Sequence, residues 1–167
     1  MKDSILRDRL QETALVGFLK DIIPILKEEL NPHNIFQKTE DEVLSYLLGI
    51  QKEHEVFIAV VDSVVVGGTV LEKKDETTDG QHTVWKLKHF VLHKNIDPEV
   101  EQKLIREIEE RLKRKSKSIK IQLNLSEREG RYIELFKRYG FKQEAILKNH
   151  YRVGETMYIY SKLLSDL

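Results

Sequence analysis

The side chains best suited to proton transfer are histidines and tyrosines, and the sequence has 6 of each. Three histidines, His82, His89 and His93, belong to one predicted strand. An imidazole can accept a proton from an amine near neutral pH, although a lone histidine in a strand is more often structural or exposed. The spacing of the three gives no credible metal face and there are 0 Cys, so we predict no metal site.

Carboxylates gather at a second place, the start of a predicted helix. Asp97, Glu99 and Glu101 occupy its first turn, and Pro98 suits the same turn. Each carboxylate stabilises a helix N-terminus by roughly 0.3–1 kcal/mol. The same charges would repel a phosphate, and Pro98 removes one amide donor. We therefore expect a well-capped structural helix here rather than a phosphate-binding one.

The N-terminal third of the chain has helical periodicity. Apolar residues recur at three- and four-residue steps from Glu12 to Leu30, although Pro24 should break or kink this helix. A second helix begins after Thr39, which forms a capping box with Glu42. Residues 4–10 fit neither a helix nor a strand cleanly.

The remainder of the chain alternates between strands and helices. Runs of β-branched or alternating residues predict strands at Val56–Val61, Val64–Leu71, His82–His93, Ile119–Leu125, Lys142–Lys148 and Thr156–Leu163. Helices are predicted from Asp97-Pro98 onward and at Arg131–Tyr139. Gly67-Gly68 indicates a bulge or a close backbone approach, and Lys73–Gln81 a loop. This order implies a mixed sheet with helices on it.

Length and composition favour a single globular domain. The 167 residues are expected to form one domain, 1–167, with a helical part at about 1–50 and a sheet part at about 55–167. Equal numbers of basic and acidic residues, 28 of each, argue against a nucleic-acid partner. The basic run Arg111–Lys120 is then the solvated end of a helix. No stretch approaches the roughly 20 apolar residues of a membrane span, and no export signal is visible, so we expect a cytoplasmic protein.

The most specific motifs of the sequence lie in its last third. Leu135–Phe141 (LFKRYGF) resembles the "L-Y-x-K-x-G-F" signature of the GNAT acetyltransferases, and Glu144–Glu155 (EAILKNHYRVGE) is similar to the ending that follows it. The resemblance implies an α/β fold of the GNAT type. Its mixed, mostly antiparallel sheet is splayed at one parallel pair and flanked by helices.

The resemblance also implies a function. A GNAT protein is an N-acetyltransferase in which an amine, from a small molecule or a protein, directly attacks acetyl-CoA. His89 is then the candidate general base, with Glu144 as a further candidate. The cofactor-binding positions carried over from the family are Phe90, Val91, Leu92, Val100, Gln102 and Lys103.

The sequence departs from the family at two functional places. The family's phosphate loop, Q/R-x-x-G-x-G/A, is absent: Asp97 stands where Arg or Gln is usual, and Val100 and Gln102 replace the small residues. Phe136 replaces the tyrosine that protonates the leaving thiolate in many members. Tyr132 and Tyr139 lie close to the same helix face and are the candidate replacements, or else core aromatics.

The sequence therefore leaves two alternative functions. The first is an acetyl-CoA-dependent N-acetyltransferase with an altered cofactor loop. The second is a catalytically inactive, GNAT-like binding or regulatory module that has lost acetyl-CoA binding. The aromatic-rich final strand is a candidate pairing edge for a homodimer.

Overall fold

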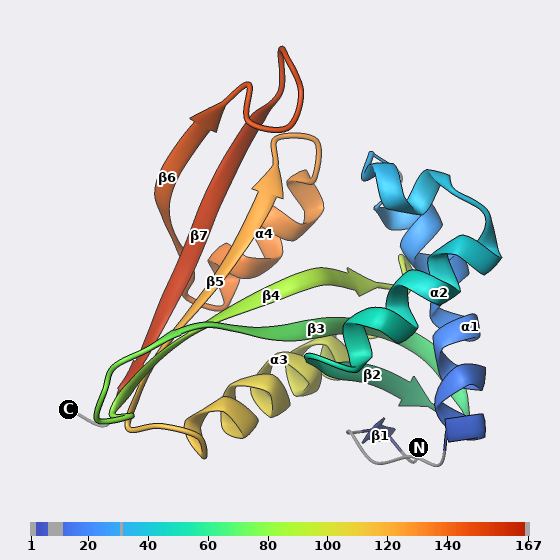
Figure 1. The fold of residues 1–167 in the computed structure, drawn as a ribbon, viewed down its shortest axis with the longest axis horizontal. Helices are drawn as coiled ribbons and strands as arrows, with labels where there is room; N and C mark the ends of the chain where they lie inside the picture. Colours follow the sequence, from blue (N-terminus) through green and yellow to red (C-terminus); the bar gives the residue numbers. More distant parts are fainter. Residues whose placement is uncertain (1–2, 7–11, 31, 166–167) are drawn as a thin grey trace. The chain divides into compact units, whose positions relative to one another are not determined.

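The computed structural model describes residues 3–6, 12–30 and 32–165 (Figure 1). The helices are α1 (Glu12–Glu29), the 3-10 helix η1 (Asn34–Gln37), α2 (Glu40–Gln51), α3 (Pro98–Lys113) and α4 (Gly130–Arg138). The strands are β1 (Asp3–Leu6), β2 (Glu55–Val61), β3 (Val64–Glu76), β4 (His82–Leu92), β5 (Ser118–Ser126), β6 (Lys142–Lys148) and β7 (Thr156–Ser165). Ser4–Leu6 is thus a strand, and residues 7–10 lie outside the described part of the chain.

The strands form one mixed sheet in the order β1-β2-β3-β4-β5-β7-β6. β4 and β5 are parallel, whereas β1 with β2, β2 with β3, and β7 with both β5 and β6 are antiparallel. The pairing of β4 with β5 runs from His82↔Ser118 to Lys86↔Gln122. The sheet is therefore mixed with helices attached to it, as the sequence predicts.

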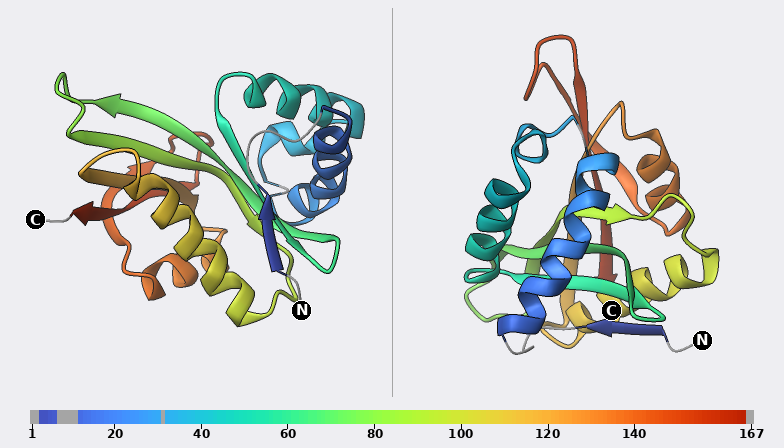
Figure 2. Two further views of the ribbon diagram at one scale, coloured as in Figure 1. Left: turned by 90° about the horizontal axis from the view of Figure 1, so that it is seen from below. Right: turned by 90° about the vertical axis from the view of Figure 1, so that its right-hand side faces the viewer.

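The chain divides into two compact units, each of which takes two stretches of the sequence. Unit 1 comprises Met1–Glu72 and His89–Ile108, and unit 2 comprises Lys73–Lys88 and Glu109–Leu167. In unit 1, α1 packs against α2. Figure 2 shows these two helices on one face of β2 and β3, with the start of α3 on the other.

Close backbone packing explains the two glycines of β3. A Cβ on Gly67 would lie 2.6 Å from the Val91 carbonyl oxygen. A Cβ on Gly68 would lie 2.5 Å from the Phe57 carbonyl oxygen and 2.7 Å from the Ile22 side chain. The close backbone approach predicted for this pair is confirmed.

Unit 2 is built on β5, β7 and β6, which lie side by side in that order, with α4 packed on β5 (Figure 1). Gly140 ends the turn after α4 with a left-handed φ of 85°, while the Phe141 amide donates to the Phe136 carbonyl oxygen at 3.0 Å. The Phe136 and Phe141 rings then meet edge to face at 5.0 Å. The motif Leu135–Phe141 thus contains the end of a helix and a contact in the core.

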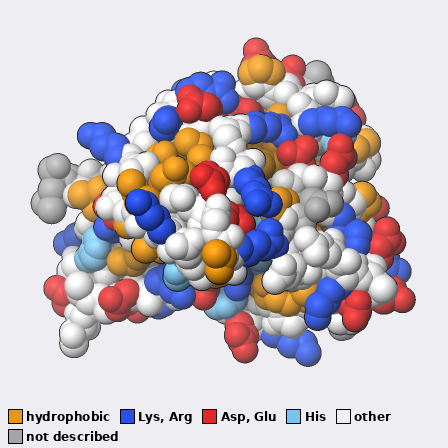
Figure 3. Space-filling model, turned by 90° about the horizontal axis from the view of Figure 1, so that it is seen from above, with side chains coloured by type: hydrophobic (Ala, Val, Ile, Leu, Met, Phe, Trp, Pro, Cys, Tyr) orange, Lys and Arg blue, Asp and Glu red, His pale blue; other side chains and the backbone are white. Residues whose placement is uncertain are grey.

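Helix ends and apolar stripes follow the sequence closely. Thr39 and Glu42 form the predicted capping box of α2. The predicted stripe of α3 is at most 7% exposed, and its members are Val100, Leu104, Ile105, Ile108 and Leu112. Arg111 and Lys113 occupy the last turn of the same helix, where cations face the carbonyl dipole. On the face shown in Figure 3, basic and acidic side chains are interspersed.

Three expectations about the elements are wrong. The break expected as one alternative at Pro24 does not occur: α1 continues to Glu29, because the buried residues on either side, such as Ile23 and Ile25, hold this stretch against the core while Pro24 itself is exposed. β3 extends to Glu76, so the first part of the expected loop Lys73–Gln81, Lys73–Glu76, is strand. β7 lies between β5 and β6, so its edges are both paired; β6 is the strand at this end of the sheet.

Within the described residues, no helix has the length and apolar character needed to cross a membrane.

Candidate functional site

The alternation of β4 breaks at His89. Thr83, Trp85 and Leu87 are buried in the first half of the strand, whereas the buried residues of the second half begin at Phe90. His89 itself has a φ of 53°, a left-handed backbone conformation that is uncommon outside glycine. Such a residue redirects its side chain as a β-bulge does. The strand that carries the candidate base is therefore locally distorted at that residue.

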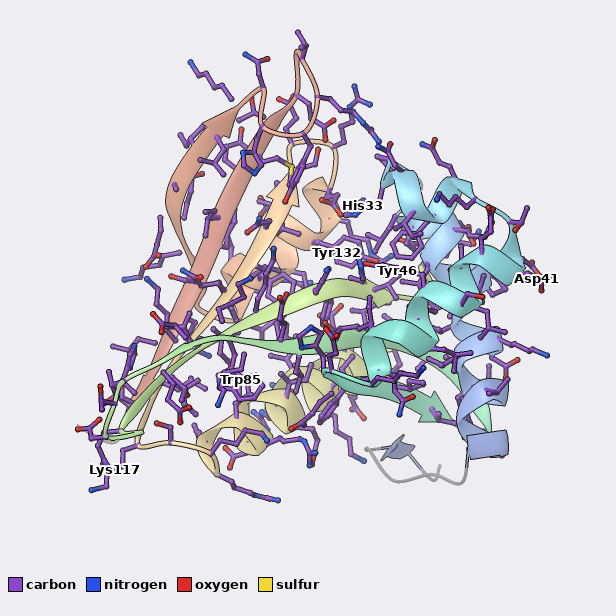
Figure 4. The ribbon with its side chains drawn as sticks, viewed as in Figure 1. His33, Asp41, Tyr46, Trp85, Lys117 and Tyr132 are labelled. Atoms are coloured by element: carbon purple, nitrogen blue, oxygen red, sulfur yellow. The ribbon has the colours of Figure 1, made fainter. Side chains whose placement is uncertain are left out.

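Three side chains of unit 1 surround the His89 imidazole. The Tyr46 hydroxyl lies 2.7 Å from His89 Nε2, within hydrogen-bond distance. The Phe36 ring meets the imidazole edge to face at 4.9 Å between centroids, and the His33 ring lies at 6.2 Å. We call His33, Phe36, Tyr46 and His89 the His89 cluster. Figure 4 labels two of its members, Tyr46 on α2 and His33 just before η1.

The phenol of Tyr46 is kept protonated by its surroundings. Partial burial, with a smaller contribution from the negative charge of Glu72, raises the pKa of Tyr46 above its ordinary value. A protonated phenol can donate its hydrogen to His89 Nε2 when the imidazole carries its own proton on Nδ1. In that tautomer the pair is a neutral donor and acceptor, and the hydrogen bond holds one imidazole nitrogen in a fixed orientation.

The cofactor-binding positions carried over from the family all lie in unit 1. Phe90, Val91 and Leu92 form the buried end of β4, and Val100 is buried on α3. Gln102 and Lys103 are exposed on the first turns of that helix. The structure therefore places these residues on β4 and α3, the two elements that the turn 93–97 connects.

The start of α3 does not fit a diphosphate. Asp97 Oδ1 accepts the Glu99 amide at 2.8 Å, so the aspartate caps the helix from within. Glu99 and Glu101 add two acidic groups to the first turn, and Pro98 has no amide to donate. The capped structural helix expected from the sequence is what the structure contains.

The tyrosines proposed as acids lie on α4 and at its end, in unit 2. Tyr132 is 2% exposed, and the Arg131 guanidinium lies 5.4 Å from the centre of its ring. Tyr139 is the half-buried C-cap residue of α4. Phe136 between them is fully buried. The geometry of Tyr132 is that of a core aromatic.

Glu144 is held as a carboxylate. It lies on β6 and pairs with Lys120 at 2.7 Å. The hydrogen bonds from Lys120 and Ser161 lower the pKa of Glu144. A carboxylate stabilised in its charged form is a weaker base than an imidazole near neutral pH, so Glu144 is the poorer candidate.

Unit 2 also contains a buried polar cluster that the sequence does not reveal. Ser126 Oγ donates to Glu155 Oε1 at 2.5 Å, and Glu129 Oε2 accepts the Ser126 amide at 2.7 Å. Arg152 lies 3.7 Å from the other oxygen of Glu155. These contacts tie the end of β5 to α4 and to the start of β7, which is a structural role.

The sequence indicates His89 as a candidate but gives no sign of its three neighbours in the structure. His33, Phe36 and Tyr46 lie 43 or more residues away from it along the chain. No motif marks them. His82 bonds instead with Ser118, and His93 with the Asn95 amide. Among the residues that the structure describes, no group of three or more His, Cys, Asp or Glu could hold a metal ion.

Comparison with known proteins identifies the fold. No family model matches the sequence, and no curated protein is similar to it in sequence. Solved structures do match. An N-acetyltransferase from Staphylococcus aureus Mu50 is 13% identical, with 97% of this chain and 98% of that chain covered and a TM-score of 0.69.

Two further structures agree. The ribosomal-protein-S18-alanine N-acetyltransferase from Escherichia coli is 13% identical, with 99% and 96% of the two chains covered and a TM-score of 0.66. A GNAT family acetyltransferase from Elizabethkingia anophelis, solved with acetyl-CoA bound, is 14% identical, with 97% and 98% covered and a TM-score of 0.63. The chain therefore has the fold of the GNAT acetyltransferases.

Proposed function

We propose that the protein is an N-acetyltransferase of the GNAT type, in which His89 is the general base for the acceptor amine. The acetyl donor is a pantetheine thioester, of which acetyl-CoA is the family example. The acceptor is a small-molecule or protein amine. The observation that carries the proposal is the His89–Tyr46 hydrogen bond of 2.7 Å on a locally distorted strand of a GNAT fold.

The reaction exchanges a thioester C–S bond for an amide C–N bond, and the proton lost by the amine balances the one gained by the thiol. The chain's own contribution is to move the amine proton. With Tyr46 donating to His89 Nε2, the hydroxyl oxygen accepts the proton of the amine as its own hydrogen passes to the imidazole. Tyr46 is thus a proton relay between the amine and His89 Nε2, and His89 is the base that finally holds the proton.

A test of this role uses His89→Asn. Asparagine tolerates the left-handed backbone of position 89 but has no basic nitrogen, so the fold survives the change. Removal of a general base lowers kcat by roughly 10²–10⁴-fold. Acetyl transfer is followed by mass spectrometry with three acceptors: spermidine, a peptide with a free α-amino group and a peptide whose only amine is a lysine.

The control is His82→Asn on the same strand, which should keep wild-type activity. Tyr46→Phe removes the relay hydroxyl and should lower kcat to a similar extent, by roughly 10²–10⁴-fold. Full activity of a folded His89→Asn protein would remove His89 from the reaction.

The inactive binding module is the second candidate, and the acidic first turn of α3 is the observation that favours it. The two functions differ in one result. An inactive module transfers no acetyl group to any of the three acceptors from acetyl-CoA or from a simpler thioester, at any donor concentration.

A further inference from the structure

Three amides of the turn from β4 into α3 are already bonded within the chain. The His93 amide donates to the Val66 carbonyl oxygen at 2.7 Å, and the Asn95 amide to the imidazole Nδ1 of His93 at 3.2 Å. The Ile96 amide donates back to the His93 carbonyl oxygen at 3.1 Å. An anion at this turn would have to displace these bonds, since bound phosphates take their hydrogen bonds from such amides.

The helix itself offers no replacement donors in its first two positions. Pro98 has no N–H, and the Glu99 amide is already bonded to Asp97 Oδ1 at 2.8 Å. The phosphate-binding arrangement of a helix N-terminus needs free amides and glycine-like access of the backbone. At this turn a carboxylate of the chain already occupies the anion position.

The charges around the turn also disfavour a bound diphosphate. Asp97, Glu99 and Glu101 are acidic, and the cation nearest along the chain, Lys94, is bound by Glu28 at 2.9 Å. Of the other titratable groups near the turn, His93 and Lys103 already have partners, as does the buried Glu101. A diphosphate would therefore meet a net negative surface, whose repulsion is felt within a Debye length.

We infer that the first turn of α3 binds no nucleotide diphosphate, so that the acyl donor is recognised through its pantetheine thioester and the ADP half of a coenzyme A donor adds no affinity. That the thioester is an acyl donor rests on the proposed function. The exclusion of the diphosphate does not. The donor class is acyl-pantetheine thioesters, whether or not they carry a nucleotide.

The experiment compares coenzyme A with pantetheine by isothermal titration calorimetry on the full chain, and acetyl-CoA with S-acetylpantetheine in the transfer assay. The inference expects coenzyme A to bind no more tightly than pantetheine, and the KM values of the two donors to agree within about threefold. Coenzyme A binding tenfold or more tightly than pantetheine would overturn it.

A charge-reversal variant tests the cause. Glu99→Lys replaces an exposed carboxylate of the first turn by a cation, and it should create a preference for coenzyme A over pantetheine of about threefold or more. Glu110→Lys makes the same change near the other end of the helix and should create none. An unchanged ratio in a folded Glu99→Lys protein would show that charge is not what excludes the diphosphate.

The two proposals fail differently. Absence of acetyl transfer from both donors contradicts the proposed function, while the calorimetric comparison of coenzyme A with pantetheine still decides the inference. Transfer that strongly prefers acetyl-CoA contradicts the inference and supports the proposed function.

Discussion

His89 combines an unfavourable backbone with a favourable set of contacts. A left-handed conformation in a non-glycine residue costs of order 1–3 kcal/mol and persists only where surrounding contacts enforce it. Here the contacts are the Tyr46 hydroxyl at 2.7 Å and the Phe36 ring at 4.9 Å. Strain of this kind concentrates at functional sites, which is why the residue is a stronger candidate in the structure than in the sequence.

The raised pKa of Tyr46 predicts a pH dependence of stability. Because the folded-state pKa lies above the unfolded one, the neutral phenol contributes its full stability below about pH 10. That contribution is lost as the pH rises through the folded-state pKa. Tyr46→Phe has no proton to lose, so its free energy of unfolding should fall less steeply than that of the wild type above about pH 10. Urea unfolding at a series of alkaline pH values measures the difference.

Tyr151→Phe serves as the reference for this comparison. Its side chain is 62% exposed, so the same loss of a phenol hydroxyl is made at the surface. Parallel slopes for the wild type and Tyr46→Phe would mean that the environment of Tyr46 does not disfavour its ionised form.

At the scale of elements, β3 depends on having no side chain at two consecutive positions. Gly68→Ala would bring a methyl group to 2.5 Å from a backbone oxygen of β2, which cannot move without shifting the strand. We expect a loss of about 1–3 kcal/mol in the free energy of unfolding, the range for overpacking a core. Chemical denaturation with a constant m-value measures it.

The matched control is Gly49→Ala in α2. A Cβ there meets nothing within 4 Å, and alanine is favoured over glycine in a helix by about 0.5–1 kcal/mol. The same substitution should therefore stabilise the protein at position 49 and destabilise it at position 68. Equal effects at both positions would contradict the close approach of β2 and β3.

Local signals explain which elements the sequence could predict. β6 is predicted at its observed bounds, Lys142–Lys148, and the stop of α4 at Gly140 follows from a glycine that takes a left-handed φ. The extension of β3 to Glu76 could not be predicted, because its polar residues are exposed and the strand is held by pairing with its neighbours. The reason that Pro24 does not end α1 is different: the packing of the buried residues beside it outweighs the local preference.

The candidate site was predictable only in part. The acidic cap of α3 follows from adjacent residues, so sequence alone indicates it. The left-handed backbone of His89 and its bond to Tyr46 depend on how α2 packs in unit 1, and a separation of 43 residues leaves no trace in a local pattern. Tyr46 looks like any half-buried residue beside the apolar stripe of its helix.

At the scale of the whole molecule, three continuous elements pass from one unit to the other. β3 crosses between Glu72 and Lys73, β4 between Lys88 and His89, and α3 between Ile108 and Glu109. Neither unit can unfold entirely without disrupting elements of the other. We therefore expect one cooperative unfolding transition, as for the single domain proposed for 1–167.

Two probes can test this cooperativity. Trp85, the single tryptophan, belongs to unit 2, whereas the 18 residues of α1 and the 12 of α2 weight the helical circular dichroism toward unit 1. The fluorescence and circular dichroism midpoints should coincide in urea. Midpoints that differ would mean that the units unfold separately and that the chain is two domains.

The turn that joins β3 to β4 has a practical consequence for handling the gene. No single break in the reading frame separates the two units, because each takes residues from two stretches of the chain. The Thr77 amide, however, bonds to the His82 carbonyl oxygen at 2.9 Å and closes a hairpin whose tip is exposed. Insertions are best tolerated at such tips. A fluorescent reporter or a new pair of chain ends therefore belongs between the exposed residues Thr78 and Asp79, ahead of Gly80, whose carbonyl oxygen accepts from Ser116.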